Sequence, residues 1–269
     1  MSPPVAVVTG ANRGIGRAIA VAFAAAGYAV LASARDPASL ADTVAEAEKA
    51  ASTADPAASR AEPGGTAVVV AAAGDVRDEA SMAALAAAAE DLGPVHAVVA
   101  NAGVAGPTAP LHEITLEQWR DTIATDLDGV FLTFRAFVPG LIARRSGSLI
   151  AISSMTGKRP LHGRTPYAAA KMGVIGLVRT LATELGPYGV RVNAVSPGYV
   201  AGPRMDLVVR KQAEVRGVPE EQVRAEVSSG SPLGQMVSAQ DVAAACVYLA
   251  AAPAITGEDL NVTAGVVMY

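Results

Sequence analysis

Residues 5–16 read VAVVTGANRGIG, and this stretch decides the fold. The apolar run Val5 to Val8 predicts a short buried strand. The glycines after it lead into an alanine-rich segment, which predicts a helix. Glycines at such a junction let backbone N–H groups approach a pyrophosphate at the helix N-terminus. The stretch therefore indicates a dinucleotide-binding fold, with the spacing G-x-x-x-G-x-G in place of the commoner G-x-G-x-x-G.

Apolar runs like the first recur along the chain and alternate with helical segments. This alternation predicts parallel strands joined by crossover helices. The expected strands lie near residues 5–8, 29–32, 67–71, 97–100, 148–152, 191–195 and 259–262. We therefore predict an α/β fold, a single Rossmann-like domain over residues 1–269 with a doubly wound seven-stranded parallel sheet. Ligands of such sheets bind at the carboxyl ends of the strands.

A second informative stretch is residues 154–171, SMTGKRPLHGRTPYAAAK. Thr165 is expected to be a helix N-cap and Pro166 the first helical residue. Tyr167 and Lys171 then lie one turn apart on the same face. An ammonium beside a phenol favours the phenolate, so Tyr167 is a candidate acid/base. Taken alone, Y-x-x-x-K is in most proteins a surface pair on a helix.

Ser154 follows the apolar run 148–152, where its hydroxyl could hold a substrate oxygen. Together with the Gly-rich loop, Tyr167 and Lys171, it makes the chain resemble the short-chain dehydrogenase/reductase family over nearly its whole length. Further family marks follow expected strands, namely Asp75, Asn101-Ala102-Gly103 and residues 192–198 (VNAVSPG).

The resemblance implies an oxidoreductase that interconverts a carbonyl and a secondary alcohol. Tyr167 would transfer the proton, the nicotinamide the hydride, while Lys171 holds the nicotinamide ribose and Ser154 hydrogen-bonds the carbonyl. Hydride arriving at a carbonyl creates an alkoxide that must be protonated, and no metal is required. Besides Tyr167 and Lys171, the implied cofactor-binding residues are Gly10, Asn12, Arg13, Gly14, Ile15, Gly16, Arg35, Asp75, Val76, Asn101, Ala102, Gly103, Pro197, Gly198 and Val200.

One position departs from the family pattern. Where relatives usually read N-L-x-G-V-F, residues 126–131 read DLDGVF, so Asp126 replaces an asparagine. In relatives this position helps to hold a water chain that leads to the lysine, and we therefore count Asp126 among the catalytic candidates. The departure leaves open a second class of function, a catalytically weak dinucleotide-binding regulator or scaffold. Epimerases and dehydratases of the wider superfamily are a third reading, which the sequence disfavours because those proteins are usually longer and carry a different glycine spacing.

The second expected strand bears on cofactor choice. NAD-dependent relatives usually carry an acidic residue at the position of Ala34, where a carboxylate would repel a 2'-phosphate. Here Ala34 is followed by Arg35, and Arg13 lies in the Gly-rich loop. Two guanidiniums suit a phosphate, so NADP is expected and NAD less so. Asp36 would instead favour NAD if the strand ended one or two residues later and brought its carboxylate to the ribose.

Other segments carry structural expectations. Residues 51–66, rich in Ala, Ser, Pro and Gly, read as a flexible surface insertion, and residues 202–231 as a substrate lid. A capping box predicts a helix from Thr115 towards Pro139. Relatives commonly form tetramers through this helix and the helix of Tyr167, which implies a homotetramer or a homodimer.

Four basic side chains crowd the loop before Tyr167: Lys158, Arg159, His162 and Arg164. Cations bordering a substrate pocket can recognise a carboxylate or a phosphate. Alternatively, they point to solvent or join a subunit interface.

Composition excludes several partners. The net charge of −4 and a pI of about 5.4 give no general attraction to nucleic acid or to anionic membranes. Cys246 is the only cysteine, so an intrachain disulfide is excluded, and we expect a packed small residue. The sequence shows neither a signal peptide nor a membrane-length apolar run, and the three scattered histidines lack zinc-ligand spacing. We expect a cytoplasmic enzyme that acts on a small carbonyl or alcohol.

Overall fold

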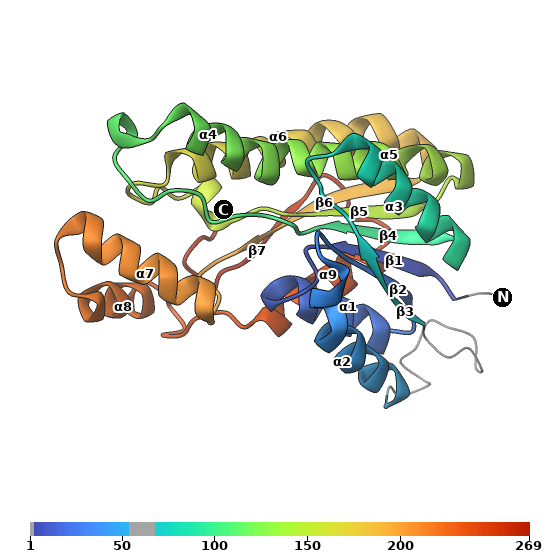
Figure 1. Ribbon diagram of the computed structural model, residues 1–269, viewed down its shortest axis with the longest axis horizontal. Coiled ribbons are helices and arrows are strands. Elements are labelled where there is room, and N and C mark those ends of the chain that lie inside the picture. Colours follow the sequence, from blue (N-terminus) through green and yellow to red (C-terminus); the bar gives the residue numbers. More distant parts are fainter. Residues whose placement is uncertain (1–2, 54–67) are drawn as a thin grey trace.

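A parallel sheet forms the centre of the computed structural model, which describes residues 3–53 and 68–269 (Figure 1). Its strand order is β3-β2-β1-β4-β5-β6-β7, and every neighbouring pair is parallel. The strands are β1 Val5–Thr9, β2 Ala29–Ala34, β3 Val69–Ala73, β4 Val95–Ala100, β5 Gly147–Ile152, β6 Val190–Pro197 and β7 Asp259–Val262. This confirms the predicted doubly wound, seven-stranded fold.

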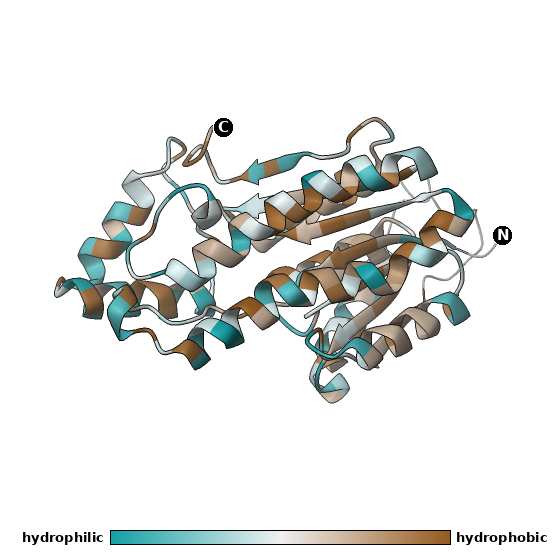
Figure 2. Cartoon of the chain, turned by 90° about the horizontal axis from the view of Figure 1, so that it is seen from above, coloured by the Kyte–Doolittle hydropathy of each residue, from teal (hydrophilic) through white to brown (hydrophobic). Residues whose placement is uncertain are grey.

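Helices cover both faces of the sheet because successive strand residues point to opposite sides. In β1, Ala6 and Val8 join the cluster beneath α1, α2 and α9, while Val5 and Val7 join the one beneath α3, α5 and α6. Figure 2 shows hydrophobic residues along the central strands and the helices packed on them. The helices are α1 Gly14–Ala25, α2 Ala41–Ser52, α3 Glu79–Leu92, α4 Leu116–Ile123, α5 Gly129–Arg144, α6 Thr165–Leu185, α7 Pro203–Arg216, α8 Glu220–Ser229 and α9 Ala239–Ala251.

The helical segment from α4 to α5 is longer than the sequence predicts. Its start is confirmed, because Thr115 caps α4 and forms the expected capping box with Gln118. A π turn at Ala124–Asp128 then links α4 to α5. The predicted end near Pro139 is wrong, since α5 runs through this proline to Arg144. The proline costs one backbone hydrogen bond, and burial of one face of α5 offsets that loss.

The start of α6 differs by one residue from the prediction. Arg164, not Thr165, occupies the N-cap position, and Thr165 is the first helical residue. Pro166 is then in the first turn, where its missing N–H has no partner to lose. The Arg164 side chain makes no capping hydrogen bond within the described chain, which leaves its guanidinium available for other contacts.

Helices α7 and α8 form an arm beside the carboxyl edge of the sheet, within residues 202–231, the segment for which a substrate lid was predicted (Figure 1). The arm has its own small apolar cluster, which includes Met205, Val209 and Val227. Gln212 on α7 donates a hydrogen bond to the carbonyl oxygen of His162 at 2.7 Å. This contact ties the arm to the loop before α6.

The structure also bears on the predicted insertion, on Cys246 and on membrane-spanning helices. Residues 51 and 52 belong to α2, so the insertion predicted from residue 51 starts too early; its remainder from residue 54 lies outside the described residues. Cys246 is fully buried in α9, and burial raises the pKa of its thiol, as expected for a packed side chain. Among the described residues, no helix is both long and apolar enough to cross a membrane.

Candidate active site

The ends of β1 and β4 are bound together at the point where the strand order reverses. Asn101 Nδ2 donates hydrogen bonds to the carbonyl oxygens of Thr9 at 2.9 Å and Gly10 at 3.1 Å. The backbone N–H groups of Asn101 and Ala102 both donate to Thr9 Oγ1 at 3.1 Å. The Asn101 side chain thus holds the Gly-rich loop against the end of β4.

The Gly-rich loop has no room for side chains at two of its glycines. Gly10 has a φ of +64°, and a Cβ on it would lie 2.8 Å from the Cα of Ala102. A Cβ on Gly16 would lie 2.2 Å from the carbonyl oxygen of Gly10. The N-cap of α1 is Arg13, and within the described chain no side chain caps the helix. Uncapped N–H groups in a glycine cradle fit a pyrophosphate.

The end of β2 carries the residues that were expected to select the cofactor. Ala34 is buried, whereas Arg35 and Arg13 are exposed. Asp36 Oδ1 accepts a hydrogen bond from the N–H of Ala38 at 3.0 Å and so caps the short helical turn after β2. One oxygen of this carboxylate is therefore engaged locally.

Asp75, expected near the cofactor, lies in a salt bridge that the sequence analysis missed. Arg77 Nη2 lies 2.9 Å from Asp75 Oδ2, and Arg77 Nε lies 3.1 Å from Oδ1. These hydrogen bonds hold the pKa of the Asp75 carboxyl below its usual value, and the charge of Arg35 contributes less. Val76, next in the chain, is buried.

Tyr167 and Lys171 lie on the same face of α6, as predicted. Lys171 Nζ is 5.6 Å from the centroid of the Tyr167 ring and donates a hydrogen bond to the carbonyl oxygen of Ile152 at 3.0 Å. Ser153, which the sequence analysis did not single out, donates from Oγ to the carbonyl oxygen of Lys171 at 2.8 Å. These contacts fix α6 to the end of β5.

Ser154 follows β5 and begins a short helical turn, Met155–Gly157. Its Oγ accepts a hydrogen bond from the N–H of Thr156 at 3.1 Å. A hydroxyl group has one proton to donate in addition to the bonds it accepts. The Ser154 proton is therefore free for a substrate oxygen.

Asp126 lies in the π turn and is fully buried beside Lys171. Its Oδ1 is 3.4 Å from Lys171 Nζ and accepts a hydrogen bond from the N–H of Val104 at 3.1 Å. Oδ2 has no hydrogen-bond partner among the described residues. A Cβ on Gly103 would lie 2.3 Å from Oδ1, so this glycine makes room for the carboxylate. Asp126 therefore gives the lysine a negatively charged neighbour where the usual asparagine would be neutral.

The end of β6 leads towards the arm. The N–H of Gly198 donates to the carbonyl oxygen of Val262 at 2.8 Å, and a Cβ on Gly198 would lie 2.9 Å from the Cα of Thr263. Pro197 is the last residue of β6. Val200 forms an isolated parallel bridge with Val237. The three residues expected here thus lie at the carboxyl edge, where β6 passes into α7.

The four basic side chains of the loop before α6 have separate environments. Lys158 Nζ lies 2.7 Å from Asp259 Oδ2 and also contacts Asn261 Oδ1, so its charge is paired on β7. Arg159 and His162 are exposed. Arg164 is only 4% exposed. Of these four side chains, only Arg164 is buried and has no acidic partner among the described residues.

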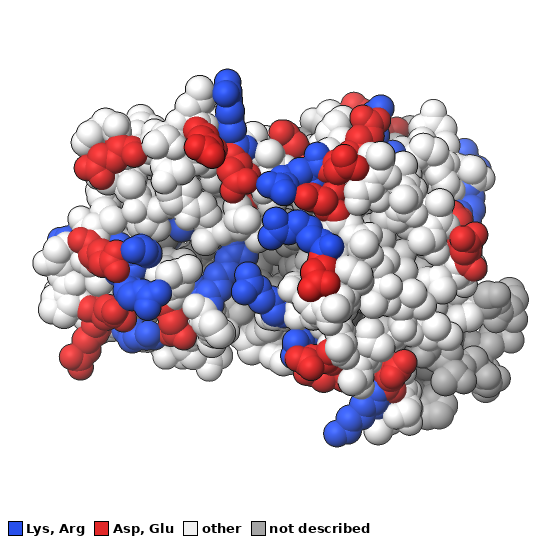
Figure 3. All heavy atoms as spheres, viewed as in Figure 1, with Lys and Arg blue, Asp and Glu red and all other residues white. Residues whose placement is uncertain are grey.

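Figure 3 shows Lys and Arg side chains around a hollow between the arm and the body of the molecule.

Arg164 contacts the candidate acid/base directly. Its guanidinium carbon lies 4.7 Å from the centroid of the Tyr167 ring, and Nη1 donates to Thr108 Oγ1 at 3.2 Å. Burial lowers the pKa of the Arg164 guanidinium, and the negative charge of an ionised Tyr167 would oppose this shift. No local pattern indicated this burial; the only sequence feature was a cation three residues before the tyrosine.

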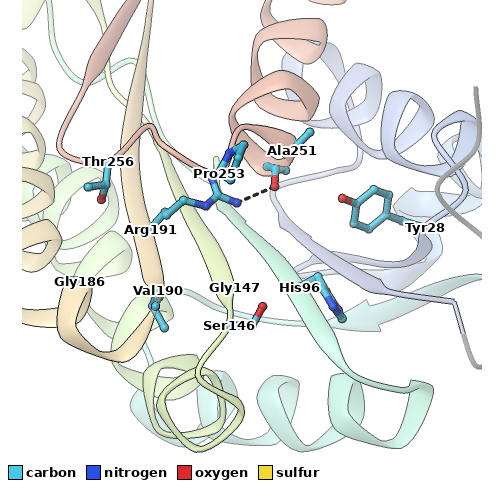
Figure 4. Close-up of a pocket in the computed structure, with 12 residues that line it drawn as sticks. Tyr28, His96, Ser146, Gly147, Gly186, Val190, Arg191, Ala251, Pro253 and Thr256 are labelled. Carbon is cyan, nitrogen blue, oxygen red and sulfur yellow. Dashed lines mark hydrogen bonds between the residues drawn. The ribbon is translucent and has the colours of Figure 1, made fainter.

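A separate pocket of about 460 Å³ lies at the opposite edge of the sheet (Figure 4). Its lining includes His96 near the start of β4 and Arg191 near the start of β6. Arg191 donates hydrogen bonds to the carbonyl oxygens of Leu249 and Ala250 at the end of α9, which gives it a structural role. None of the candidate residues lines this pocket.

Comparisons with known proteins agree with this arrangement. A family model described as short chain dehydrogenase matches residues 4–213. The chain is 39% identical to cis-4-hydroxycyclohexanecarboxylate dehydrogenase of Sinomonas cyclohexanicum, over 97% of this chain and 95% of the relative. It is 34% identical to 3-oxoacyl-(acyl-carrier-protein) reductase of Synechocystis sp., over 100% and 99%. A crystal structure of a variant actinorhodin polyketide ketoreductase with NADPH matches with a TM-score of 0.88 at 32% identity, covering 100% of both chains.

Proposed function

The chain belongs to the short-chain dehydrogenase/reductase family of NAD(P)-dependent oxidoreductases, and we propose that it interconverts a carbonyl and a secondary alcohol with NADP(H). Tyr167 is the proposed general acid/base. The observation that supports the proposal is that Lys171, one turn after Tyr167 on α6, is bonded to Ile152 and Ser153 at the end of β5, directly before Ser154. The Gly-rich loop lies on the same edge of the sheet.

The residues present fit a dinucleotide. At Gly10 and Gly16 a Cβ would collide with neighbouring backbone, so the tight loop requires glycine there, and the uncapped start of α1 offers N–H groups to a pyrophosphate. Arg13 and Arg35 would hold a 2'-phosphate, with Ala34 offering no repulsion, which supports NADP over NAD. When bound, the nicotinamide supplies or accepts the hydride.

The protein side chains handle the proton and the oxygen. In reduction, Tyr167 gives its hydroxyl proton to the carbonyl oxygen as the alkoxide develops, and Ser154 donates a second hydrogen bond to the same oxygen. Lys171, held by the carbonyl oxygen of Ile152, places a positive charge near the phenol and favours the phenolate left behind. In oxidation the same proton moves back to Tyr167.

Asp126 modifies this arrangement without blocking it. An amide could accept the hydrogen bond from Val104 equally well, but the carboxylate also offsets part of the lysine charge. Because its Oδ2 has no partner in the described chain, it can accept a hydrogen bond from a water molecule on the route to Lys171. We propose that Asp126 belongs to the proton relay.

The test is an assay of NADPH oxidation by the purified protein against a panel of carbonyl compounds. The names of the relatives suggest two substrate classes, acyl-carrier thioesters with a 3-oxo group and hydroxy acids with a ring. Steady oxidation with at least one carbonyl, absent in Tyr167→Phe, is the expected result. If the protein binds NADPH but reduces none of the panel, the proposed activity is wrong and a regulatory role is favoured.

We further propose that the protein is an oligomer. Phe131 on α5 and Met172 on α6 are 48% and 49% exposed, on the helices through which relatives associate. Light scattering after size-exclusion chromatography should give the mass of a dimer or a tetramer. Phe131→Glu should shift that mass towards a monomer, and a monomeric wild-type protein would refute the proposal.

A further inference from the structure

Arg164 carries a buried charge without a counter-ion. No Asp or Glu of the described residues lies within salt-bridge distance of its guanidinium, and the one hydrogen bond that its side chain makes to those residues goes to the neutral hydroxyl of Thr108. Its Nε is buried and has no hydrogen-bond partner in the described part of the chain. A buried charge left in this state costs free energy, because neither water nor an opposite charge replaces the hydration it lost.

A nearby carboxylate could neutralise Arg164, but it is paired with another cation. Asp126 is close enough to act on Arg164 electrostatically, yet its Oδ1 is directed to Lys171. Lys158, six residues before Arg164, is paired with Asp259. In the same loop, the charge of Lys158 is therefore neutralised by a carboxylate, whereas that of Arg164, beside Tyr167, has no acidic partner among the described residues.

A second guanidinium approaches from the arm. Arg204 is the second residue of α7 and is exposed, and its positive charge adds to the lowering of the Arg164 pKa, after burial. No side chain in the described structure caps α7, so the positive end of its dipole lies beside Arg204. The hydrogen bond from Gln212 to His162 keeps α7 against the loop. Two like charges held together on different elements are stabilised by an anion between them.

We propose that Arg164, assisted by Arg204, binds the carboxylate of a compact oxo acid or hydroxy acid whose carbonyl or hydroxyl oxygen lies at Tyr167 and Ser154. This inference rests on the proposed function. The carboxylate is unchanged in the reaction: hydride adds to the carbonyl carbon, the Tyr167 proton goes to the oxygen, and NADPH becomes NADP⁺.

The position of Arg164 limits the size of the substrate. Because its guanidinium packs on the Tyr167 ring, the carboxylate must lie only a few bonds from the reacting carbon. The phosphate of a carrier-bound acyl thioester lies at the far end of a long flexible arm. Such a phosphate does not reach Arg164 while its thioester's oxo group is at Tyr167.

The experiment compares matched acids and esters: acetoacetate with methyl acetoacetate, and levulinate with methyl levulinate. Wild type should reduce at least one acid with a higher kcat/KM than its ester. Arg164→Gln should lower kcat/KM for the acid by about 10- to 100-fold more than for the ester, the range expected for one hydrogen bond to a charged group. Arg159→Gln, which removes an exposed cation of the same loop, should change neither by more than about twofold.

Two further variants, Arg164→Lys and Arg204→Gln, are compared on the same acids and esters. The lysine variant keeps the charge and should retain part of the acid preference, even if the glutamine variant fails to fold. Arg204→Gln should lower the preference less than Arg164→Gln does. If neutral ketones and esters are reduced but acids are no better, or if Arg164→Lys and Arg204→Gln leave the preference unchanged, the inference is wrong and the proposed function stands.

A binding measurement separates failure of the inference from failure of the activity. With NADPH present, levulinate should raise the melting temperature of wild type more than that of Arg164→Lys or Arg204→Gln, whether or not turnover occurs. Methyl levulinate should show no such difference. If levulinate gives the same shift in all three proteins, the carboxylate site does not exist.

Discussion

Replacing Tyr167 with Phe tests the proposed chemistry with little change to the structure. The variant removes one hydroxyl, for which the described residues provide no hydrogen-bond partner. The phenyl ring keeps its packing against Arg164 at 4.7 Å and Lys171 at 5.6 Å. The free energy of unfolding should therefore change by no more than about 0.5 kcal/mol, as for substitutions that leave packing intact.

The loss in rate should be far larger. A positioned acid contributes about 10²- to 10⁴-fold, which corresponds to about 2.7 to 5.5 kcal/mol of transition-state stabilisation. The assay is NADPH oxidation at saturating carbonyl, with the dissociation constant of NADPH measured by fluorescence. Tyr188→Phe, which alters an exposed tyrosine, is the control and should retain full activity. A Tyr167→Phe variant that keeps more than about a tenth of wild-type kcat refutes the assigned role.

Three further predictions test the cofactor site and the fold. Ala34→Asp combined with Arg35→Ile should lower the ratio of kcat/KM for NADPH over NADH, because a carboxylate repels the 2'-phosphate; an unchanged ratio would refute that site. Gly16→Ala should weaken NADPH binding by about tenfold or more in calorimetric titration, because its Cβ would lie 2.2 Å from a loop carbonyl oxygen. Gly176→Ala, with no atom within 4 Å of its new Cβ, should leave binding intact and stabilise α6 by about 0.5 to 1 kcal/mol. Lys158→Met should lower the free energy of unfolding by about 3 to 5 kcal/mol in urea titration, since it leaves a buried carboxylate unpaired; a loss below about 1 kcal/mol would contradict this.

The sequence was sufficient to predict the strands of the sheet and the positions of the motifs along them. Buried parallel strands are continuous apolar runs, so each was recognisable locally, and the observed bounds differ by at most two residues at either end among the described residues. Tyr167 and Lys171 were expected on one face because helical periodicity alone requires it. These features depend on neighbouring residues in the chain.

The electrostatic details of the site depend on contacts between distant segments, and the sequence did not reveal them. The four basic side chains before α6 look equivalent in sequence. In the structure, however, Lys158 is paired with a carboxylate on β7, and Arg164 is buried with its guanidinium packed on the Tyr167 ring. Similarly, the departure at Asp126 was visible, but its 3.4 Å approach to Lys171 was not. Which charge meets which partner is decided by packing, and local patterns contain no signal for it.

The π turn at Ala124–Asp128 makes the site sensitive to chain length as well as to residue type. An α-helix turns about 100° per residue, and a π turn accommodates one residue more than an α turn. Deleting one residue from this segment would merge α4 and α5 into one continuous α-helix and rotate α4 by about that angle relative to α5. The carboxylate beside Lys171 would then move to another face of the helix. In comparisons of related chains, a one-residue gap here therefore signifies an altered lysine environment, even where every aligned motif is identical.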